Sequence, residues 1–311
     1  MNIKHTLAAT ALLGSAFQAA AFDAAPQVHH DTIEIQGVRV FYREAGPADA
    51  PTVLLLHGFG ASSYMFRNLI PVLAQRYHVV APDLPGFGQT EVAAGTHFDY
   101  TFDRLTSVID AFTVAKGIDR YAMYVFDYGA PVGWRLAVKH PEKITAIVSQ
   151  NGNAYEAGLS AGWADARKAW AHPTAENREA LRHFNSPEMI QWQYQEGVKD
   201  PSLIAPEPYQ LASAAIARIG ETPQIDLLAN YGENIKQYPQ LHAYFRQYQP
   251  PLLAIWGEHD PFFVPAGAEA FKGDLPKADV QFVDTGHFAI ETHGDAIAKA
   301  MLEFLDRNLK R

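Results

Sequence analysis

The most regular feature of the chain is a series of short, mainly apolar runs, each followed at once by glycine or polar residues. The runs lie at residues 51–56, 77–81, 121–126, 144–149, 251–256 and 280–284. A short apolar run without strict alternation is typical of a strand that is covered on both faces. The pattern therefore predicts a buried sheet.

Between these runs the apolar residues recur at helical spacing. Residues 103–116 show this most clearly, and residues 66–76, 129–140 and 295–308 follow the same pattern. Residues 32–43 predict a β-hairpin ahead of the sheet. Because strands alternate with helices, we predict an α/β fold with a mostly parallel central sheet and helices on both faces.

The alternation stops in one long stretch. Residues 153–249 have no clear buried strand, but many aromatic residues and helix-like segments separated by prolines. We predict a core of residues 27–152 and 250–311, with residues 153–249 inserted after the sixth strand as a helical cap. Ligands bind at the carboxyl ends of strands in open α/β sheets, so we expect the cap to lie over that edge.

The first residues resemble a signal peptide. Lys4 and His5 precede an apolar stretch from Thr6 to Phe17, and small residues at 19–21 suit a signal peptidase. A buried N-terminal helix is the alternative. The apolar run is too short to span a bilayer. We therefore expect a signal peptide over residues 1–21, a periplasmic or secreted protein, and no stable membrane insertion.

Composition excludes several classes of function. The net charge is −9 and no basic run occurs, which argues against nucleic-acid binding. With no cysteine, catalysis by a thiolate is excluded. No metal-ligand spacing is present, and Gly58-Phe59-Gly60 lacks the third glycine of a nucleotide loop. We expect neither a metal nor a cofactor.

Asp127 occupies the most informative position. The segment Val125-Phe126-Asp127-Tyr128-Gly129 joins a predicted strand directly to a predicted helix, with no loop between them beyond a sharp turn. This is the position of the nucleophile elbow, usually Gly-x-Ser-x-Gly, with aspartate in place of serine. A carboxylate can attack carbon and form an ester. The alternative is that Asp127 only caps the helix.

Two further residues complete a catalytic set. Asp260 and His287 each follow a predicted strand, so both should lie at the same sheet edge as Asp127. Along the chain, Asp127, Asp260 and His287 follow the order nucleophile, acid, base that is usual in hydrolases with a nucleophile elbow. An imidazole can take a proton from water, and a carboxylate can orient it. His259, in the loop before the acid, is expected to be structural.

The turn after the first buried strand predicts an anion site. His57-Gly58-Phe59-Gly60 is a sharp glycine turn at the same edge. It can aim the Phe59 N–H at a developing negative charge, together with the N–H of Tyr128.

These motifs together resemble the epoxide hydrolase and haloalkane dehalogenase branch of the α/β-hydrolases. The resemblance runs from about His29 to the C-terminus and is carried by His57-Gly58-Phe59-Gly60, Asp83-Leu84-Pro85-Gly86-Phe87-Gly88, Phe126-Asp127-Tyr128-Gly129, Trp256-Gly257-Glu258-His259-Asp260 and Gly286-His287-Phe288. It implies that Asp127 forms an ester with the substrate. His287, oriented by Asp260, then activates the water that hydrolyses this ester.

The resemblance also bears on the substrate. Dehalogenases of the branch usually place Trp after the nucleophile and Asn or Glu in the oxyanion turn, where this chain has Tyr128 and Phe59. These departures favour a small apolar epoxide over a halogenated substrate, with water as co-substrate. A haloalkane or haloacid dehalogenase is the alternative, and a non-catalytic binder on the same fold is a third.

Epoxide hydrolases of this branch donate a proton from cap tyrosines. Tyr231 lies about where the second of these tyrosines sits. The first position aligns with Ile190 or Gln191, so Tyr194 or Tyr155 would have to substitute, or one donor would suffice. Simple packing is the alternative for each cap tyrosine.

The branch also offers an alternative position for the acid. Some exported epoxide hydrolases place it after the sixth strand, which here is near residues 151–153, with Glu156 not far away. Asp260 is preferred because its loop matches the usual acid loop directly.

Overall fold

A single sheet organises residues 26–309, the part of the chain that the computed structural model describes. Its strands are β1 (His29–Ile35), β2 (Val38–Ala45), β3 (Thr52–Leu56), β4 (His78–Pro82), β5 (Glu91–Val92), β6 (Tyr121–Phe126), β7 (Ile144–Gln150), β8 (Leu252–Gly257) and β9 (Asp279–Val283). They are ordered β1-β2-β4-β3-β6-β7-β8-β9, and β5 pairs with β2. Strand β2 is antiparallel to β1, β4 and β5, and all other pairs are parallel.

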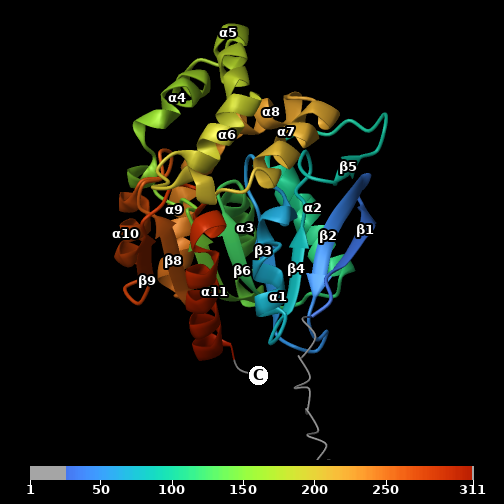
Figure 1. Cartoon of the computed structure of the whole chain (residues 1–311), viewed down its shortest axis with the longest axis vertical. Coiled ribbons are helices and arrows are strands. Elements are labelled where there is room, and N and C mark those ends of the chain that lie inside the picture. Colours follow the sequence, from blue (N-terminus) through green and yellow to red (C-terminus); the bar gives the residue numbers. More distant parts are fainter. Residues whose placement is uncertain (1–25, 310–311) are drawn as a thin grey trace, which may run out of the picture.

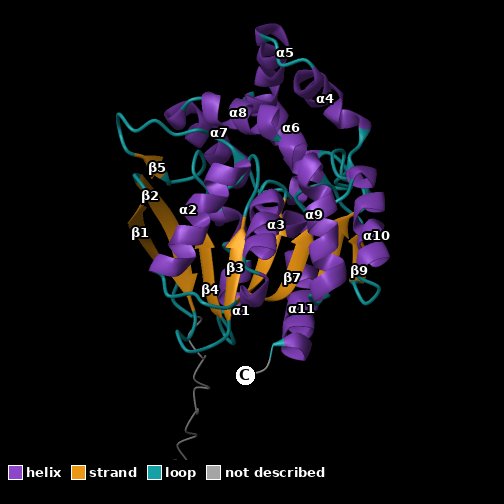
Figure 2. Cartoon of the chain, turned by 180° about the vertical axis from the view of Figure 1, so that it is seen from behind, coloured by secondary structure: helices purple, strands orange, loops and turns teal. Residues whose placement is uncertain are grey.

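Helices cover both faces of this sheet. On the face seen in Figure 1 lie α1 (Leu69–Leu73) and α11 (Ala289–Asn308). The other face, seen in Figure 2, carries α2 (Phe102–Ala115), α3 (Gly129–Lys139), α9 (Gly232–Tyr248) and α10 (Pro265–Asp274). Strands β4, β6 and β8 are buried at every residue, as an apolar strand between two helical layers must be. The predicted α/β class is confirmed.

Five helices lie over the carboxyl ends of the parallel strands, at the top of Figure 1. They are α4 (Ala164–Ala171), α5 (Ala175–Glu179), α6 (Pro187–Gln195), α7 (Glu207–Ile219) and α8 (Thr222–Asn230). Short 3-10 helices lie at Ser63–Phe66, Pro141–Lys143, Glu156–Gly158, Ala161–Trp163, Ala180–Asn185 and Pro201–Leu203. We refer to residues 153–230 as the cap.

The predicted cap, residues 153–249, differs from this arrangement at one end. Its last helix, α9, packs along α3 on the face of the sheet instead of over its edge. The insertion follows the strand predicted as the sixth, as expected, although that strand is β7 in the structure. The reason is the two-residue strand β5, which joins β2 through register pairs at Val38 and Arg39 and was too short to predict.

Two helices depart from their predicted bounds. Within residues 66–76 the structure has only the end of the 3-10 helix at Ser63–Phe66 and then α1; Pro71 has no N–H to bond the carbonyl of Arg67, so the two do not join into one α-helix. The C-terminal helix starts at Ala289, six residues before the predicted start, and is kinked at His293.

The predicted signal peptide, residues 1–21, lies outside the described residues. Within residues 26–309, none of the helices has both the length and the apolar character needed to cross a membrane.

Candidate active site

Asp127 stands at the sharp turn between β6 and α3. Its backbone is left-handed, with φ of 46°, which costs a non-glycine residue roughly 1 kcal/mol. Glycines on either side make room for the turn. A Cβ at Gly129 would lie 2.3 Å from Leu56 O, and one at Gly58 would lie 2.4 Å from the Asp127 Cβ. The turn thus lifts a buried carboxylate above the sheet edge.

The two oxygens of Asp127 have different surroundings. Oδ1 accepts hydrogen bonds from the N–H groups of Phe59 and Tyr128, both at 2.6 Å. Oδ2 lies 3.8 Å from His287 Nε2. The structure therefore places Phe59 and Tyr128 at the carboxylate, as the sequence predicts for an oxyanion site. It leaves Oδ2 as the oxygen that can attack.

His287 is held by Asp260. Its Nδ1 lies 2.6 Å from Asp260 Oδ2, and both side chains are buried. The other oxygen of Asp260 accepts hydrogen bonds from the N–H groups of Phe262 and Phe263, at 2.7 and 3.0 Å. Because Asp260 accepts the Nδ1 proton, Nε2 is left to face Asp127. The three residues predicted from separate motifs thus come together at one edge.

Asn151 is a further member of the site; the sequence marked its position only as an alternative place for the acid, and not as a partner of Asp260. It follows β7 with φ of 47°, and its Nδ2 donates to Asp260 Oδ2 at 2.6 Å. Its Oδ1 accepts from the N–H of Gly257 at 2.9 Å. Glu156, the carboxylate near the alternative acid position, is exposed. Asn151 therefore occupies that position as a neutral partner of the acid.

Burial sets the protonation of the central pair. It raises the pKa of Asp127 to about 6, even though His287 and the Phe59 and Tyr128 amides favour the carboxylate. Burial also opposes a proton on His287, but the charge and hydrogen bond of Asp260 and the charge of Asp127 outweigh it and raise the pKa of His287. At neutral pH Asp127 is therefore mainly ionised, as a nucleophile must be.

A small cavity of about 30 Å³ lies over Asp127. Its walls are mostly apolar and come from both the core and the cap: Phe59, Asp127, Tyr128, Gly162, Trp163, Phe184, Gln193, Leu228 and Phe262. The hydroxyl of Tyr128 and the amide nitrogen of Gln193 are buried, and neither has a hydrogen-bond partner among residues 26–309. Sequence patterns gave no indication of Trp163 or Gln193.

The three tyrosines proposed from the sequence as proton donors have different surroundings. Tyr231 packs on Tyr128, with ring centroids 5.8 Å apart, but is not part of the cavity wall. The hydroxyl of Tyr194 donates to Gly60 O at 2.9 Å. That of Tyr155 donates to Asp274 Oδ2 at 3.0 Å. The expectation that Tyr194 or Tyr155 serves as a proton donor is therefore corrected, because both hydroxyls are bound away from the cavity.

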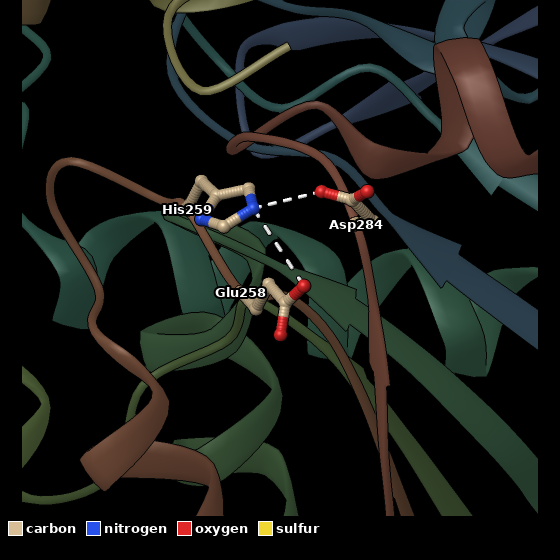
Figure 3. Close-up of side chains that lie close together, drawn as sticks. All are labelled: Glu258, His259 and Asp284. Atoms are coloured by element: carbon tan, nitrogen blue, oxygen red, sulfur yellow. Dashed lines mark hydrogen bonds and ion pairs between the residues drawn. The ribbon is translucent and has the colours of Figure 1, made fainter. Parts of the chain in front are cut away.

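An exposed polar cluster lies on the loops that carry the acid and the base. Figure 3 shows the imidazole of His259 pointing toward Asp284 and Glu258, with Nε2 at 2.8 and 3.6 Å from their oxygens. These side chains are close enough to hold a metal ion. However, Lys199 Nζ lies 3.2 Å from Asp284 and would repel a cation. His259 links the two loops, which fits the structural role expected of it.

Comparison with known proteins gives a consistent result. Residues 51–294 match the family model described as alpha/beta hydrolase fold. An uncharacterized hydrolase of Saccharomyces cerevisiae is 44% identical over 282 residues, which cover 89% of this chain and 97% of that protein. A haloalkane dehalogenase of Psychrobacter cryohalolentis is 26% identical over 300 residues, covering 89% of this chain and 91% of that protein.

Solved structures include an epoxide hydrolase from Vigna radiata. It superimposes with a TM-score of 0.71 at 26% identity and covers 90% of this chain and 98% of that one. The chain is thus similar both to a haloalkane dehalogenase and to an epoxide hydrolase.

Proposed function

Because this chain belongs to the alpha/beta hydrolase fold family, we propose that it is an epoxide hydrolase that opens a small epoxide to a diol through an ester on Asp127. One observation carries the proposal. Asp127 Oδ1 is held by two backbone amides, while Oδ2 lies 3.8 Å from an imidazole that Asp260 orients. The likeness of the chain to a haloalkane dehalogenase and to an epoxide hydrolase supports the same hydrolytic chemistry.

In the first step, Asp127 Oδ2 attacks a ring carbon of the epoxide. The new bond joins Oδ2 to that carbon, and the carbon–oxygen bond of the ring breaks with its electron pair on the oxygen. This alkoxide is strongly basic and takes a proton from the hydroxyl of a tyrosine of the enzyme. The product of the step is a hydroxyalkyl ester of Asp127 and a tyrosinate.

In the second step, His287 Nε2 takes a proton from water, and the hydroxide attacks the carboxyl carbon of Asp127. The former Oδ1 becomes the oxyanion, already placed on the amides of Phe59 and Tyr128. Collapse of this intermediate breaks the bond between the carboxyl carbon and Oδ2. The leaving diol oxygen takes up the second proton of the attacking water. The remaining proton returns from His287 to the tyrosinate, so that one epoxide and one water give one diol.

Tyr128 and Tyr231 are the candidate proton donors. Burial, together with the charge of Asp127, raises the pKa of both hydroxyls well above the ordinary value. Both therefore stay protonated at neutral pH and can donate. Tyr128 lines the cavity directly, whereas Tyr231 is not part of the cavity wall. We favour Tyr128, with Tyr231 as the second donor expected from the sequence.

The size of the cavity favours a small substrate. At about 30 Å³ it has room for little more than one or two water molecules, since roughly 10–15 Å³ of such space holds one. Even an epoxide of three or four carbons therefore needs the cap to move, and a larger one needs a larger movement. We expect propylene oxide to react faster than an aryl-substituted epoxide of equal intrinsic reactivity.

A dehalogenase is the second candidate, favoured by the haloalkane dehalogenase of which 91% aligns with this chain. The same attack of Asp127 would then release a halide, which needs no proton. Purified protein should be incubated with propylene oxide and with 1-bromopropane. Diol as the main product supports the epoxide hydrolase, and bromide without diol overturns it in favour of the dehalogenase.

Trapping the ester tests the shared mechanism. Without the base, the His287→Gln variant should form the ester and fail to hydrolyse it. Intact-protein mass should then rise by the mass of one epoxide, and peptide mapping should place the adduct on Asp127. The His287→Gln, Asp127→Asn double variant is the matched control and should stay unmodified. An unchanged mass in the single variant with both substrates would refute the ester mechanism.

A further inference from the structure

Gln193 is the polar residue on the inner face of α6. Ile190, Gln193 and Tyr194 are the buried side chains of this helix, at the spacing of one helical face. Ile190 is apolar, and the hydroxyl of Tyr194 is bound to Gly60 O at 2.9 Å. Among these three side chains of α6, Gln193 is the one that brings to the cavity a hydrogen-bonding group without a partner among residues 26–309. Packing would be served equally well by an apolar residue of the same size.

The amide of Gln193 lies above the oxyanion turn. Its side chain lines the cavity together with Asp127, Phe59 and Tyr128, and the residue is 4% exposed. Its Oε1 would be 4.0 Å from a Cβ placed on Gly60. Within residues 26–309, Nε2 has no hydrogen-bond acceptor. Buried donors without a partner are rare and costly, so such a donor in a reaction cavity points to an acceptor on the substrate.

We propose that Gln193 Nε2 donates a hydrogen bond to the oxygen that the substrate releases when Asp127 attacks. This inference rests on the proposed epoxide hydrolase function. As the ring carbon–oxygen bond breaks, charge builds on that oxygen and the amide hydrogen bond strengthens. A carboxamide is far too weak an acid to give up its proton, so Gln193 stabilises the charge while a tyrosine hydroxyl supplies the proton. It therefore acts only in the ester-forming step.

The test uses Gln193→Met, which keeps the length of the side chain and removes the donor. Gln191→Met is the matched control, because Gln191 lies on the exposed face of the same helix. Both changes are made in the His287→Gln background, and the rate of ester formation with propylene oxide is followed by intact-protein mass. A hydrogen bond to a charged oxygen is worth roughly 10- to 100-fold in rate. Gln193→Met should lose that factor and Gln191→Met should lose none.

A second measurement separates this role from packing. With His287 intact, single-turnover hydrolysis of the ester should have the same rate in Gln193→Met as in the unsubstituted protein. Ester formation from 1-bromopropane should fall less than that from propylene oxide, since bromide is a weak acceptor. Thermal unfolding should show no loss of stability, because the variant removes an unpaired buried donor.

Each outcome decides the matter. Equal rates of ester formation in Gln193→Met and Gln191→Met overturn the proposed role of Gln193 and leave the epoxide hydrolase standing. A parallel fall in ester formation and ester hydrolysis, or a loss of thermal stability, assigns Gln193 to packing and also overturns it. If the His287→Gln parent forms no adduct with any epoxide, the proposed function fails and this inference fails with it.

Discussion

Replacing Asp127 by Asn should stabilise the protein at neutral pH while it abolishes ester formation. Asparagine has the shape of aspartate, and its Oδ1 can keep the hydrogen bonds from the N–H groups of Phe59 and Tyr128. It also tolerates the left-handed backbone at this position, where φ is 46°. What it removes is a negative charge that the fold has to bury. The expected gain is therefore electrostatic and depends on pH.

The magnitude follows from the pKa of Asp127. Burial raises it from an ordinary 3.8 to about 6, and two units correspond to about 3 kcal/mol. The sign is that of an acid whose charged form is disfavoured by folding. The free-energy cost of burying the charge is absent below the pKa that Asp127 has in the unfolded chain. It grows as the pH rises from that value toward 6 and reaches its full size above pH 6. Asp127→Asn should thus gain about 3 kcal/mol at pH 8 and about half of that at pH 5.

Urea unfolding at pH 5 and pH 8 measures this gain directly. Asp119→Asn is the matched control, because Asp119 is exposed in a loop and its replacement should change the free energy of unfolding by less than about 0.5 kcal/mol. If Asp127→Asn is no more stable than the unsubstituted protein at pH 8, the buried charge carries no penalty. A gain that is the same at both pH values would show that it has another source.

Further predictions concern the individual steps, each followed by single-turnover kinetics. Ester formation should decline below about pH 6, where Asp127 takes up a proton. Ester hydrolysis should instead follow the pKa of His287, which Asp260 raises and which must be exceeded before His287 can act as a base. Identical pH profiles for the two steps would contradict this. Asn151→Gly accepts φ of 47° without strain but loses the bond to the acid, and we expect ester hydrolysis to slow about 10-fold with ester formation nearly unchanged. Tyr128→Phe should slow ester formation from an epoxide about 100-fold and more than Tyr231→Phe, and it should have little effect with a bromoalkane; a larger effect of Tyr231→Phe would make Tyr231 the main donor.

The strands and the three central residues could be predicted because both depend on local sequence. An apolar run followed by a polar loop marks a strand and its carboxyl end at the same time. Once the sheet is parallel, those ends must meet at one edge, so Asp127, Asp260 and His287 converge without any knowledge of side-chain packing. The structure places His287 Nδ1 2.6 Å from Asp260, which this reasoning requires. The pairing of β5 with β2 depends on only two residues and left no such pattern.

The remaining members of the site depend on contacts between distant segments. Asn151 matters because Asp260, more than a hundred residues later, accepts its hydrogen bond. The sequence shows only a polar residue after a buried strand. Gln193 is one of three glutamines in α6, and only its place beside Ile190 and Tyr194 on the buried face distinguishes it. The sequence also offered Tyr155 as a substitute proton donor, yet its hydroxyl is bound to Asp274 at 3.0 Å.

Three features that cost folding free energy lie in the cavity over Asp127 or in the hydrogen-bonded set that includes Asp260 and His287. Asp127 carries a buried charge on a left-handed backbone. Asn151, at the end of the neighbouring strand, has a left-handed backbone as well. Gln193 buries a donor that has no partner among residues 26–309. Local violations of this kind persist at functional sites because the surrounding structure compensates for them. Here β6 and β7 provide that support, since they pair in parallel from Tyr121 to Phe126 and hold both strained residues at the same edge. These costs fit the reaction site that we propose at Asp127.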